Sequence, residues 1–334
     1  MRRALVTGAT GQVGAYLVER LAADGWRVRA LVRSPAAASW LEPLGAALIS
    51  GDIMDLPRLR AAAEGCEAIF HAAALVTTRH AGWPLFQAAN VEGTRNAIAA
   101  AESSGAKLVQ VSSVAVYGGA ARYRDTPTDE GTPLAPLPEH AFYARSKRES
   151  EALVMEAHAE GRIWGTAVRP DVIYGRYDRQ FVPRIAPLMQ RGIFPLIAGG
   201  RAVMAIVHAA NVADGAVRAV DAPLAGGSAY NLANDFDVSV ADFVRLGAIG
   251  LGKHVVRVPV PMAVARLGFN GLRMGLRLAR GKSASNDALS TLYFLTKDNP
   301  FTSERARREL GWAPPVRPEV GIPDAFRWWR EQRG

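Results

Sequence analysis

The chain has 334 residues, of which 49% are hydrophobic, and its formal net charge at pH 7 is +9. A chain of this length and composition can bury a large core, which excludes an intrinsically disordered protein. It contains no run of five like charges that would suit a nucleic-acid tail, and three arginines interrupt the apolar stretch 258–279, which excludes a membrane-spanning helix there.

Short apolar runs bounded by turn residues alternate with longer stretches of helical periodicity through the first half of the chain. The runs predict five strands, at 3–8, 26–33, 46–52, 67–74 and 106–113. Helices are predicted at 11–25 and 85–105, each ending in glycine. This alternation indicates an α/β protein with a doubly wound parallel sheet, the Rossmann fold, over residues 1–169.

Prolines and glycines become frequent after residue 169, and the regular alternation breaks up. We expect residues 170–334 to form mainly a smaller, discontinuous substrate-binding domain. A segment around 203–233 is expected to return to the Rossmann domain.

A glycine-rich turn follows the first predicted strand and opens a helix, which is the context in which such a turn binds a dinucleotide. Its first glycine permits the tight turn, the second lets the backbone approach the pyrophosphate, and the third lets helix and strand pack closely. The spacing is looser than the usual pattern, and an ordinary strand-to-helix turn is the alternative. The cofactor residues predicted here are Gly8, Thr10, Gly11, Gln12, Val13 and Gly14.

Arg33 and Ser34 end the second predicted strand, where an acidic residue would normally accept hydrogen bonds from the adenosine ribose. A guanidinium and a hydroxyl suit a 2′-phosphate instead, so NADP(H) is favoured and NAD(H) remains the alternative. A solvated surface arginine is the competing interpretation. Asp52 and Ile53, after the third strand, are predicted to flank the adenine, and a helix N-cap is the competing role for Asp52.

Tyr143 and Lys147 are four residues apart, hence on one helix face about one turn from each other. A tyrosine can move the proton that accompanies hydride transfer, provided that a nearby ammonium favours the phenolate. Ser113 ends a predicted sheet strand, where open α/β folds place their ligands, and could hydrogen-bond the substrate oxygen. An exposed helical pair is the structural alternative for the tyrosine and lysine.

With these motifs the chain resembles the extended short-chain dehydrogenase/reductase superfamily, which includes the NAD-dependent epimerase/dehydratase family. The resemblance implies Ser113, Tyr143 and Lys147 as catalytic residues, with Lys147 also on the nicotinamide ribose. It implies a structural or proton-relay role for Asn90. The further cofactor contacts that it implies are Ala72, Ala73, Ala74, Asn90, Tyr143, Pro170 and Val172.

The substrate half favours an apolar substrate over a nucleotide sugar. Nucleotide-sugar members of the superfamily usually carry an arginine four residues before the histidine that corresponds to His208, where this chain has Met204. The segment 293–316 resembles the 3β-hydroxysteroid dehydrogenase-like and dihydroflavonol reductase-like branch. These features predict an NADP(H)-dependent oxidoreductase that interconverts a secondary alcohol and a ketone on a sterol-, polyketide- or flavonoid-like molecule.

Two other functions stay open: a nucleotide-sugar epimerase or dehydratase with tightly bound NAD, and a non-catalytic NADP-binding sensor or scaffold. The intact Ser113, Tyr143 and Lys147 argue against the latter.

Arginines 266, 273, 277 and 280 fall along one stripe of a helical projection over 262–280, with glycines 268, 271 and 275 roughly opposite. A core-docked helix with solvated arginines is the simplest interpretation, and a substrate lid or a peripheral membrane contact are the others. The lone Cys66 and the absence of histidine pairs at ligand spacing predict a cytoplasmic protein without a metal. We expect no nucleic-acid partner, and a homodimer is left open.

Overall fold

The computed structural model describes residues 1–76, 82–119, 127–280 and 291–333, with the side chains of 272–280 left out. It contains a seven-stranded, fully parallel sheet with the order β10-β6-β5-β4-β1-β2-β3. The strands of this sheet are β1 (Arg3–Thr7), β2 (Arg27–Val32), β3 (Ala46–Ser50), β4 (Ala68–His71), β5 (Lys107–Val111), β6 (Gly165–Pro170) and β10 (Ala229–Leu232). The predicted doubly wound Rossmann fold and its first five strands are confirmed.

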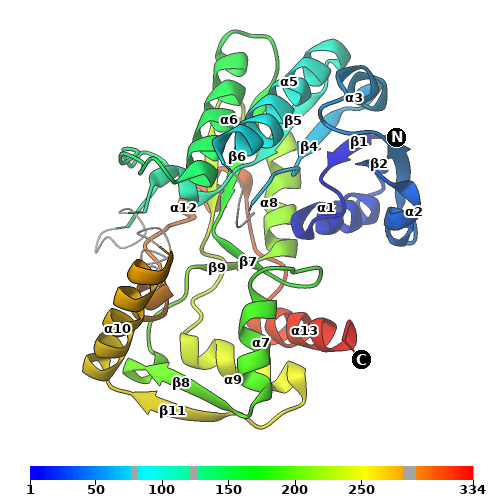
Figure 1. Ribbon diagram of the computed structural model, residues 1–334. Coiled ribbons are helices and arrows are strands. Elements are labelled where there is room, and N and C mark those ends of the chain that lie inside the picture. The colour runs from blue at the N-terminus through cyan, green and yellow to red at the C-terminus, as the bar shows by residue number, and fades with distance from the viewer. Residues whose placement is uncertain (77–81, 120–126, 281–290, 334) are drawn as a thin grey trace.

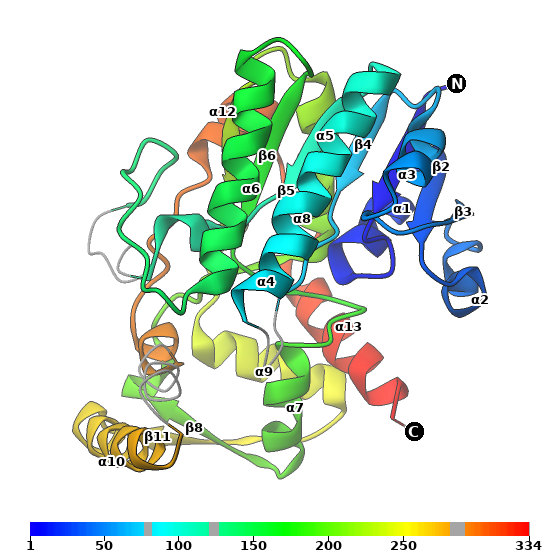
Figure 2. The same ribbon diagram turned by 45° about the horizontal axis from the view of Figure 1, so that its top comes forward.

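Helices cover both faces of the sheet, because its central strands are apolar on both sides. One face carries α1 (Gln12–Ala23) and α8 (Ala209–Asp221), which pack on each other. The other carries α3 (Leu56–Ala63), α5 (Gly93–Ser104) and α6 (Phe142–Ala159) (Figures 1 and 2). Short helices α2 (Pro35–Ala38) and η1 (Ser39–Leu41) follow β2.

The predicted continuous helix over 85–105 is wrong in one respect. The chain forms α4 (Trp83–Phe86), then a π-helical turn η2 (Gln87–Glu92), and only then α5. The wider turn directs Asn90 at the loop after β4 and at α6, where it forms three hydrogen bonds. A π turn inserts one extra residue into a helix and is frequent at functional sites.

A second hydrophobic core lies below the sheet in the view of Figure 1. It is built from α7 (Val182–Gln190), β8 (Ile193–Ile197), α9 (Val240–Leu251) and α13 (Pro318–Glu331). Strand β8 pairs with β11 (Val256–Val260) in a two-stranded parallel ribbon, and β7 (Val172–Tyr174) pairs with β9 (Ile206–His208) between the two parts. We call α7, β8, α9, β11 and α10 (Met262–Arg280) the lower lobe.

The chain crosses between the two cores more than once. After β9 it returns through α8 to β10 at the edge of the large sheet. Near the end, α12 (Glu304–Leu310) and the buried Trp312 pack on the core between the sheet and α8, before α13 packs on α9. Helix α10 is continuous despite its glycines. Among the described residues, no helix is both long and apolar enough to cross a membrane.

Candidate active site

The turn between β1 and α1 accepts only glycine at two positions. Gly8 has φ +69°, and a Cβ there would lie 2.5 Å from the backbone nitrogen of Ala73, in the loop after β4. A Cβ on Gly14 would lie 2.1 Å from the carbonyl oxygen of Gly8. Both approaches involve backbone atoms that have no room to move, so the turn, the helix and the neighbouring loop are held close together.

The N-terminus of α1 is open toward an anion. Gly11 is the N-cap and provides no side-chain cap, and the first turn contains no acidic residue. The N–H groups of a first helical turn attract negative charge, such as a pyrophosphate. The Nε2 atom of Gln12 is buried and has no hydrogen-bond partner among the described residues, which fits a group that accepts from it. Thr10 is half-buried here, whereas Val13 is buried in the core.

Arg33 lies exposed just past β2, at the same sheet edge as the glycine turn, since Leu31 of β2 pairs with Thr7 of β1. The hydroxyl of Ser34 accepts from the Ala37 N–H (3.5 Å) and caps α2. A cap uses the oxygen only as an acceptor, so the hydroxyl proton remains to be donated.

Asp52 lies in the loop after β3 but does not cap the helix that follows. Asp52 accepts from the Met54 N–H (2.9 Å) within a turn, and the N-cap of α3 is Asp55. The N-cap role for Asp52 is therefore wrong. Ile53 is held against α5, because its carbonyl accepts from Asn96 Nδ2 (2.8 Å) and its side chain packs against Gly93.

Asn90 holds the loop that follows β4, which includes Ala72, Ala73 and Ala74. Its amide donates to the Leu75 carbonyl (2.9 Å) and to Ser146 Oγ (2.8 Å), and its Oδ1 accepts from the Leu75 N–H (2.6 Å). Asn90 is buried, its bond to Ser146 is buried, and its two bonds to Leu75 are partly buried. They connect this loop to α6, the helix that carries Tyr143 and Lys147.

His71, at the end of β4, connects the glycine-turn strand to the same network. Its Nδ1 lies 2.8 Å from Thr7 Oγ1 and its Nε2 lies 3.1 Å from Thr94 Oγ1. The Thr94 hydroxyl donates to the Asn90 carbonyl (2.7 Å), so it accepts from a protonated Nε2. Burial, together with the charge of Lys147, lowers the pKa of His71 to about 3, which keeps the ring neutral.

Lys147 is buried at the carboxyl end of β5, where its Nζ donates to the Val111 carbonyl (2.7 Å). Burial lowers its pKa to about 8, and the charge of Glu151 opposes this shift. Tyr143 is half-buried one turn earlier on α6. Ser113 follows β5, and its Oγ accepts from the Ala115 N–H (3.2 Å) as the cap of η3 (Val114–Tyr117).

Glu151 is a residue of this site that the sequence reasoning missed. It forms a buried ion pair with Arg169 of β6, with a shortest N–O distance of 2.5 Å, and Arg169 also donates to Tyr117 OH (2.7 Å). The i+4 spacing from Lys147 is its one sequence signal. The adjoining Pro170 is buried, and the Val172 N–H donates to Asp171 Oδ1 (2.8 Å).

The predicted residues therefore lie along one edge of the sheet, at the carboxyl ends of β1, β2, β3, β4, β5 and β6. Open α/β sheets bind ligands at this edge. Within the described parts of the chain, no three His, Cys, Asp or Glu side chains gather into a metal site.

Comparison with known proteins agrees with this arrangement. The model of the NAD dependent epimerase/dehydratase family matches residues 4–233. The chain is 34% identical to the 4-hydroxy-2-methyl-3-oxo-4-farnesyl-3,4-dihydroquinoline-1-oxide ketoreductase of Stigmatella aurantiaca, over 97% of this chain and 96% of that protein. It is 29% identical to the 2-alkyl-3-oxoalkanoate reductase of Stenotrophomonas maltophilia, over 95% and 96% of the two chains.

Solved structures share the fold. The crystal structure of gox2253 matches with a TM-score of 0.75 and 27% identity, covering 100% of this chain and 99% of its own. The UDP-glucuronic acid 4-epimerase of Bacillus cereus, in complex with NAD, matches with a TM-score of 0.74 and 17% identity, over 99% and 100% of the chains.

Proposed function

Because the chain belongs to the NAD-dependent epimerase/dehydratase family and is an NAD(P)-dependent oxidoreductase of the extended short-chain dehydrogenase/reductase type, we propose that it interconverts a ketone and a secondary alcohol on an apolar small molecule. The observation that carries the proposal is Lys147, a buried cation one helical turn from Tyr143 and beside the strand end that leads to Ser113. A buried lysine is unfavourable for folding, and a role in the reaction accounts for it.

In the reduction, Tyr143 gives its phenolic proton to the substrate oxygen as the carbonyl becomes an alcohol. A phenol with a pKa of about 10 is a weak acid, and the Lys147 ammonium favours the phenolate that remains. The Ser113 hydroxyl donates a hydrogen bond to the same substrate oxygen. When bound, the nicotinamide supplies the hydride for reduction or accepts it in oxidation. In the oxidation, the Tyr143 phenolate takes the proton back.

We further propose NADP(H) as the cofactor. The backbone of the glycine turn, with Thr10, Gln12 and Val13, would hold the pyrophosphate, and Arg33 and Ser34 would hold the 2′-phosphate. Asp52 and Ile53 would lie against the adenine. The open N-terminus of α1 and the Gln12 Nε2, which has no hydrogen-bond partner within the described parts of the chain, support the first assignment, and the exposed guanidinium of Arg33 supports the second.

The rest of the cofactor would lie along the loops after β4 and β6, against Ala72, Ala73 and Ala74 and then Pro170 and Val172. Lys147 and Tyr143 would contact the nicotinamide ribose. Asn90 would act by holding the loop after β4 rather than by touching the cofactor, as its three hydrogen bonds support. The single cysteine suits a reducing compartment, so we place the protein in the cytoplasm.

The apolar substrate class is supported by the ketoreductase relative and by Met204. This side chain is 1% exposed and packs in the core of the lower lobe, so no cation stands where nucleotide-sugar enzymes of the superfamily carry an arginine for the diphosphate. The second candidate, a nucleotide-sugar epimerase or dehydratase, is favoured by the epimerase and dehydratase structures that share the fold.

The substrate class is tested by following NADPH absorbance with a panel of apolar 2-alkyl-3-oxo acids and cyclic ketones, and separately by assaying UDP- and dTDP-sugars. We expect NADPH oxidation with members of the first panel only. Tyr143→Phe should lower kcat about 10²- to 10⁴-fold and leave the NADPH Kd nearly unchanged. Tyr230→Phe, on the outermost strand β10, removes a hydroxyl bonded to Glu309 of α12 and is the matched control. Turnover of a nucleotide sugar with retained NAD would replace the proposal with the second candidate.

The cofactor choice is tested by the NADPH and NADH dissociation constants before and after Arg33→Ala. Since charge-assisted bonds to a phosphate are strong, we expect NADPH binding to weaken at least tenfold while NADH binding changes little. Arg27→Ala, at the opposite end of the same strand, is the control. Tighter binding of NADH by the unaltered protein would overturn the NADP assignment.

A further inference from the structure

Two stretches of the sequence that include most of the lower lobe are rich in cations. Residues 179–213 contain four arginines, residues 243–286 contain eight lysines and arginines, and neither stretch contains Asp or Glu. These cations alone exceed the net charge of +9, so the remainder of the chain is slightly acidic. Such an asymmetric distribution of charge along a chain favours anionic partners for the basic stretches.

The same lobe exposes one apolar face of the β8–β11 ribbon. Side chains alternate along β8: Phe194 and Leu196 are buried in the core, whereas Ile193 and Pro195 point the other way and are exposed. Val256 and Val258 of β11 pair with Ile193 and Pro195 and are exposed on the same side. Natural sheets usually cover such a face or make it polar.

Helix α10 covers only the far end of this face. Its buried Ala265, with Phe269, packs on Ile197 and Val260, which continue the two exposed rows of the ribbon. The exposed ribbon face therefore adjoins α10. The helix presents further apolar side chains to solvent at Val264 and Leu267.

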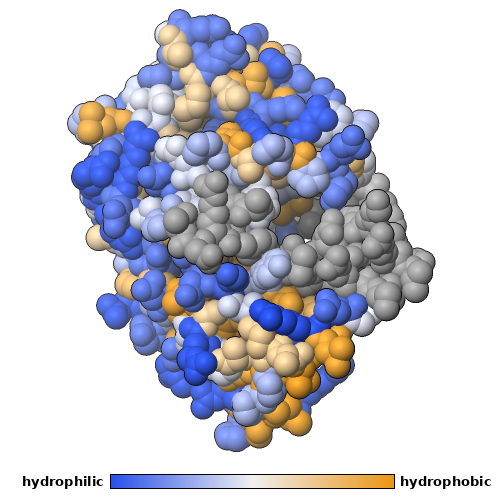
Figure 3. Space-filling model, turned by 90° about the vertical axis from the view of Figure 1, so that its left-hand side faces the viewer, coloured by the Kyte–Doolittle hydropathy of each residue, from blue (hydrophilic) through white to orange (hydrophobic). Residues whose placement is uncertain are grey.

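We define the lobe face by these exposed residues: Ile193, Pro195, Val256, Val258, Val264 and Leu267. Its five large side chains other than proline are 42% to 76% exposed. Hydrophobic side chains gather over the lower part of the molecule in Figure 3, where α10 and the ribbon lie. Contiguous exposed apolar surface marks a contact with a membrane or another protein.

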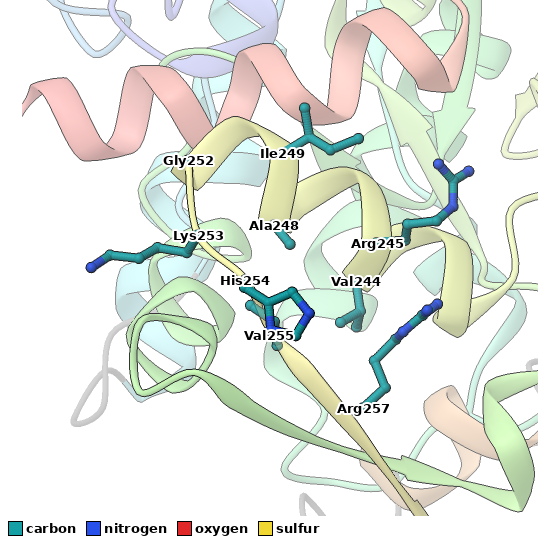
Figure 4. A pocket seen from close by; sticks show the side chains of 9 residues that line it. All are labelled: Val244, Arg245, Ala248, Ile249, Gly252, Lys253, His254, Val255 and Arg257. Carbon is teal, nitrogen blue, oxygen red and sulfur yellow. The ribbon is translucent and has the colours of Figure 1, made fainter.

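Cations lie near the lobe face, and some of them are on the α9 side of the ribbon, because Arg257 alternates with Val256 and Val258 and pairs with the buried Phe194. An open pocket of about 430 Å³ between α9 and β11 is lined by Arg245, Lys253, His254 and Arg257, with Arg245 and Arg257 on one side and Lys253 on the other (Figure 4). Asp242 pairs with Arg245 (3.2 Å). Arg266, on α10, is exposed. In the described part of the chain, no carboxylate lies within ion-pair distance of Lys253, Arg257 or Arg266. Arginines 273, 277 and 280 lie outside the described side chains.

We propose that the lobe face binds the surface of an anionic phospholipid membrane. Exposed apolar side chains in the interface, with long basic side chains near them, are what a bilayer with acidic headgroups recognises. No described helix can span a membrane, so the contact is peripheral. This inference is independent of the catalytic proposal, although an enzyme seated there would meet apolar substrates where they dissolve.

The test is cosedimentation of the full-length protein with phosphatidylglycerol vesicles and with phosphatidylcholine vesicles. We expect binding to the first and at least tenfold weaker binding to the second, with loss of binding as NaCl is raised from 0.05 to 0.5 M. Leu267→Glu and Val256→Glu should each weaken binding at least tenfold, and Lys253→Glu about fivefold or more, since each basic residue near an anionic surface contributes about that factor.

Leu224→Glu, an equally exposed apolar position on the sheet-bearing part, is the matched control and should bind as the unaltered protein does. Thermal unfolding and the NADPH Kd verify that each variant folds. Equal binding to both lipids, or no binding, overturns the proposal. The proposal is also overturned if the protein binds no vesicles but forms a dimer that Leu267→Glu dissociates, because the lobe face would then contact a second copy of the chain.

Discussion

Replacing Lys147 by methionine should abolish activity without destabilising the fold. Methionine has a similar length and is apolar, so it suits the buried position better than an ammonium does. The buried ion pair of Glu151 with Arg169 remains intact in this variant. Loss of activity without loss of stability in this variant would show that Lys147 serves the reaction and not the fold.

The magnitude follows from the pKa of Lys147, which burial lowers from 10.5 to about 8. A tenfold change in an equilibrium constant is about 1.4 kcal/mol, so holding the ammonium in this site costs about 3 kcal/mol relative to water. Methionine removes that cost and also the bond to the Val111 carbonyl, a charge-assisted hydrogen bond that contributes about 1.5 to 3 kcal/mol. The free energy of unfolding at pH 7 should therefore rise by about 0 to 2 kcal/mol.

The pH dependence has a definite sign. Below about pH 8 the lysine is charged in both the folded and the unfolded state, so the cost is fully present. As the pH rises from about 8 toward 10.5, the folded lysine loses its proton before the unfolded one, and the stability of the natural protein rises relative to the variant. Any stability advantage of the variant should thus shrink over this range.

Urea unfolding at pH 7 and at pH 9.5, followed by tryptophan fluorescence, measures both effects. Lys253→Met, at an exposed position of the lower lobe, is the control and should change the free energy of unfolding little. A loss of more than about 2 kcal/mol in the Lys147 variant, or a difference from the natural protein that stays constant with pH, would contradict this prediction.

Three further outcomes are expected. Asn90→Ala should lower the free energy of unfolding by about 2 to 3 kcal/mol, because it removes three hydrogen bonds, of which one is buried and two are partly buried; a loss below about 1 kcal/mol in urea would contradict this. Gly14→Ala should destabilise by at least about 2 kcal/mol and weaken NADPH binding, since its Cβ would meet the Gly8 carbonyl, whereas Gly119→Ala, whose added Cβ would have no atom of the described residues within 4 Å, should do neither. The rate of ketone reduction should fall as the pH rises through about 8, where Lys147 loses its proton, and a profile that stays flat to pH 9.5 would contradict that role.

The sheet and the glycine turn could be predicted because their signals are local. Each strand is a short apolar run between turn residues, and Gly8 and Gly14 are required by contacts within one strand-turn-helix unit and its neighbour. The positions of Lys147 and Ser113 at one strand end also followed from the rule that parallel strands end at one edge.

Other features depend on contacts between segments far apart in the sequence. The π turn at Asn90 exists because of the loop after β4 and Ser146, 56 residues away, and helical periodicity contains no sign of it. The pairing of Glu151 with Arg169, and the exposed ribbon face beside α10, likewise arise only when the chain is folded. Such pairings override what a local pattern can indicate.

We propose above that Tyr143, Lys147 and Ser113 serve a net hydride transfer between NADPH and a ketone. The most direct measurement uses NADPH deuterated at the transferring position of C4, with a ketone that is reduced in the panel, and mass spectrometry of the product. We expect one deuterium on the new carbinol carbon of each product molecule, and the same deuterated product formed about 10²- to 10⁴-fold more slowly when Tyr143 is replaced by phenylalanine. A product that forms without deuterium, while the enzyme keeps its nucleotide through turnover, would contradict it.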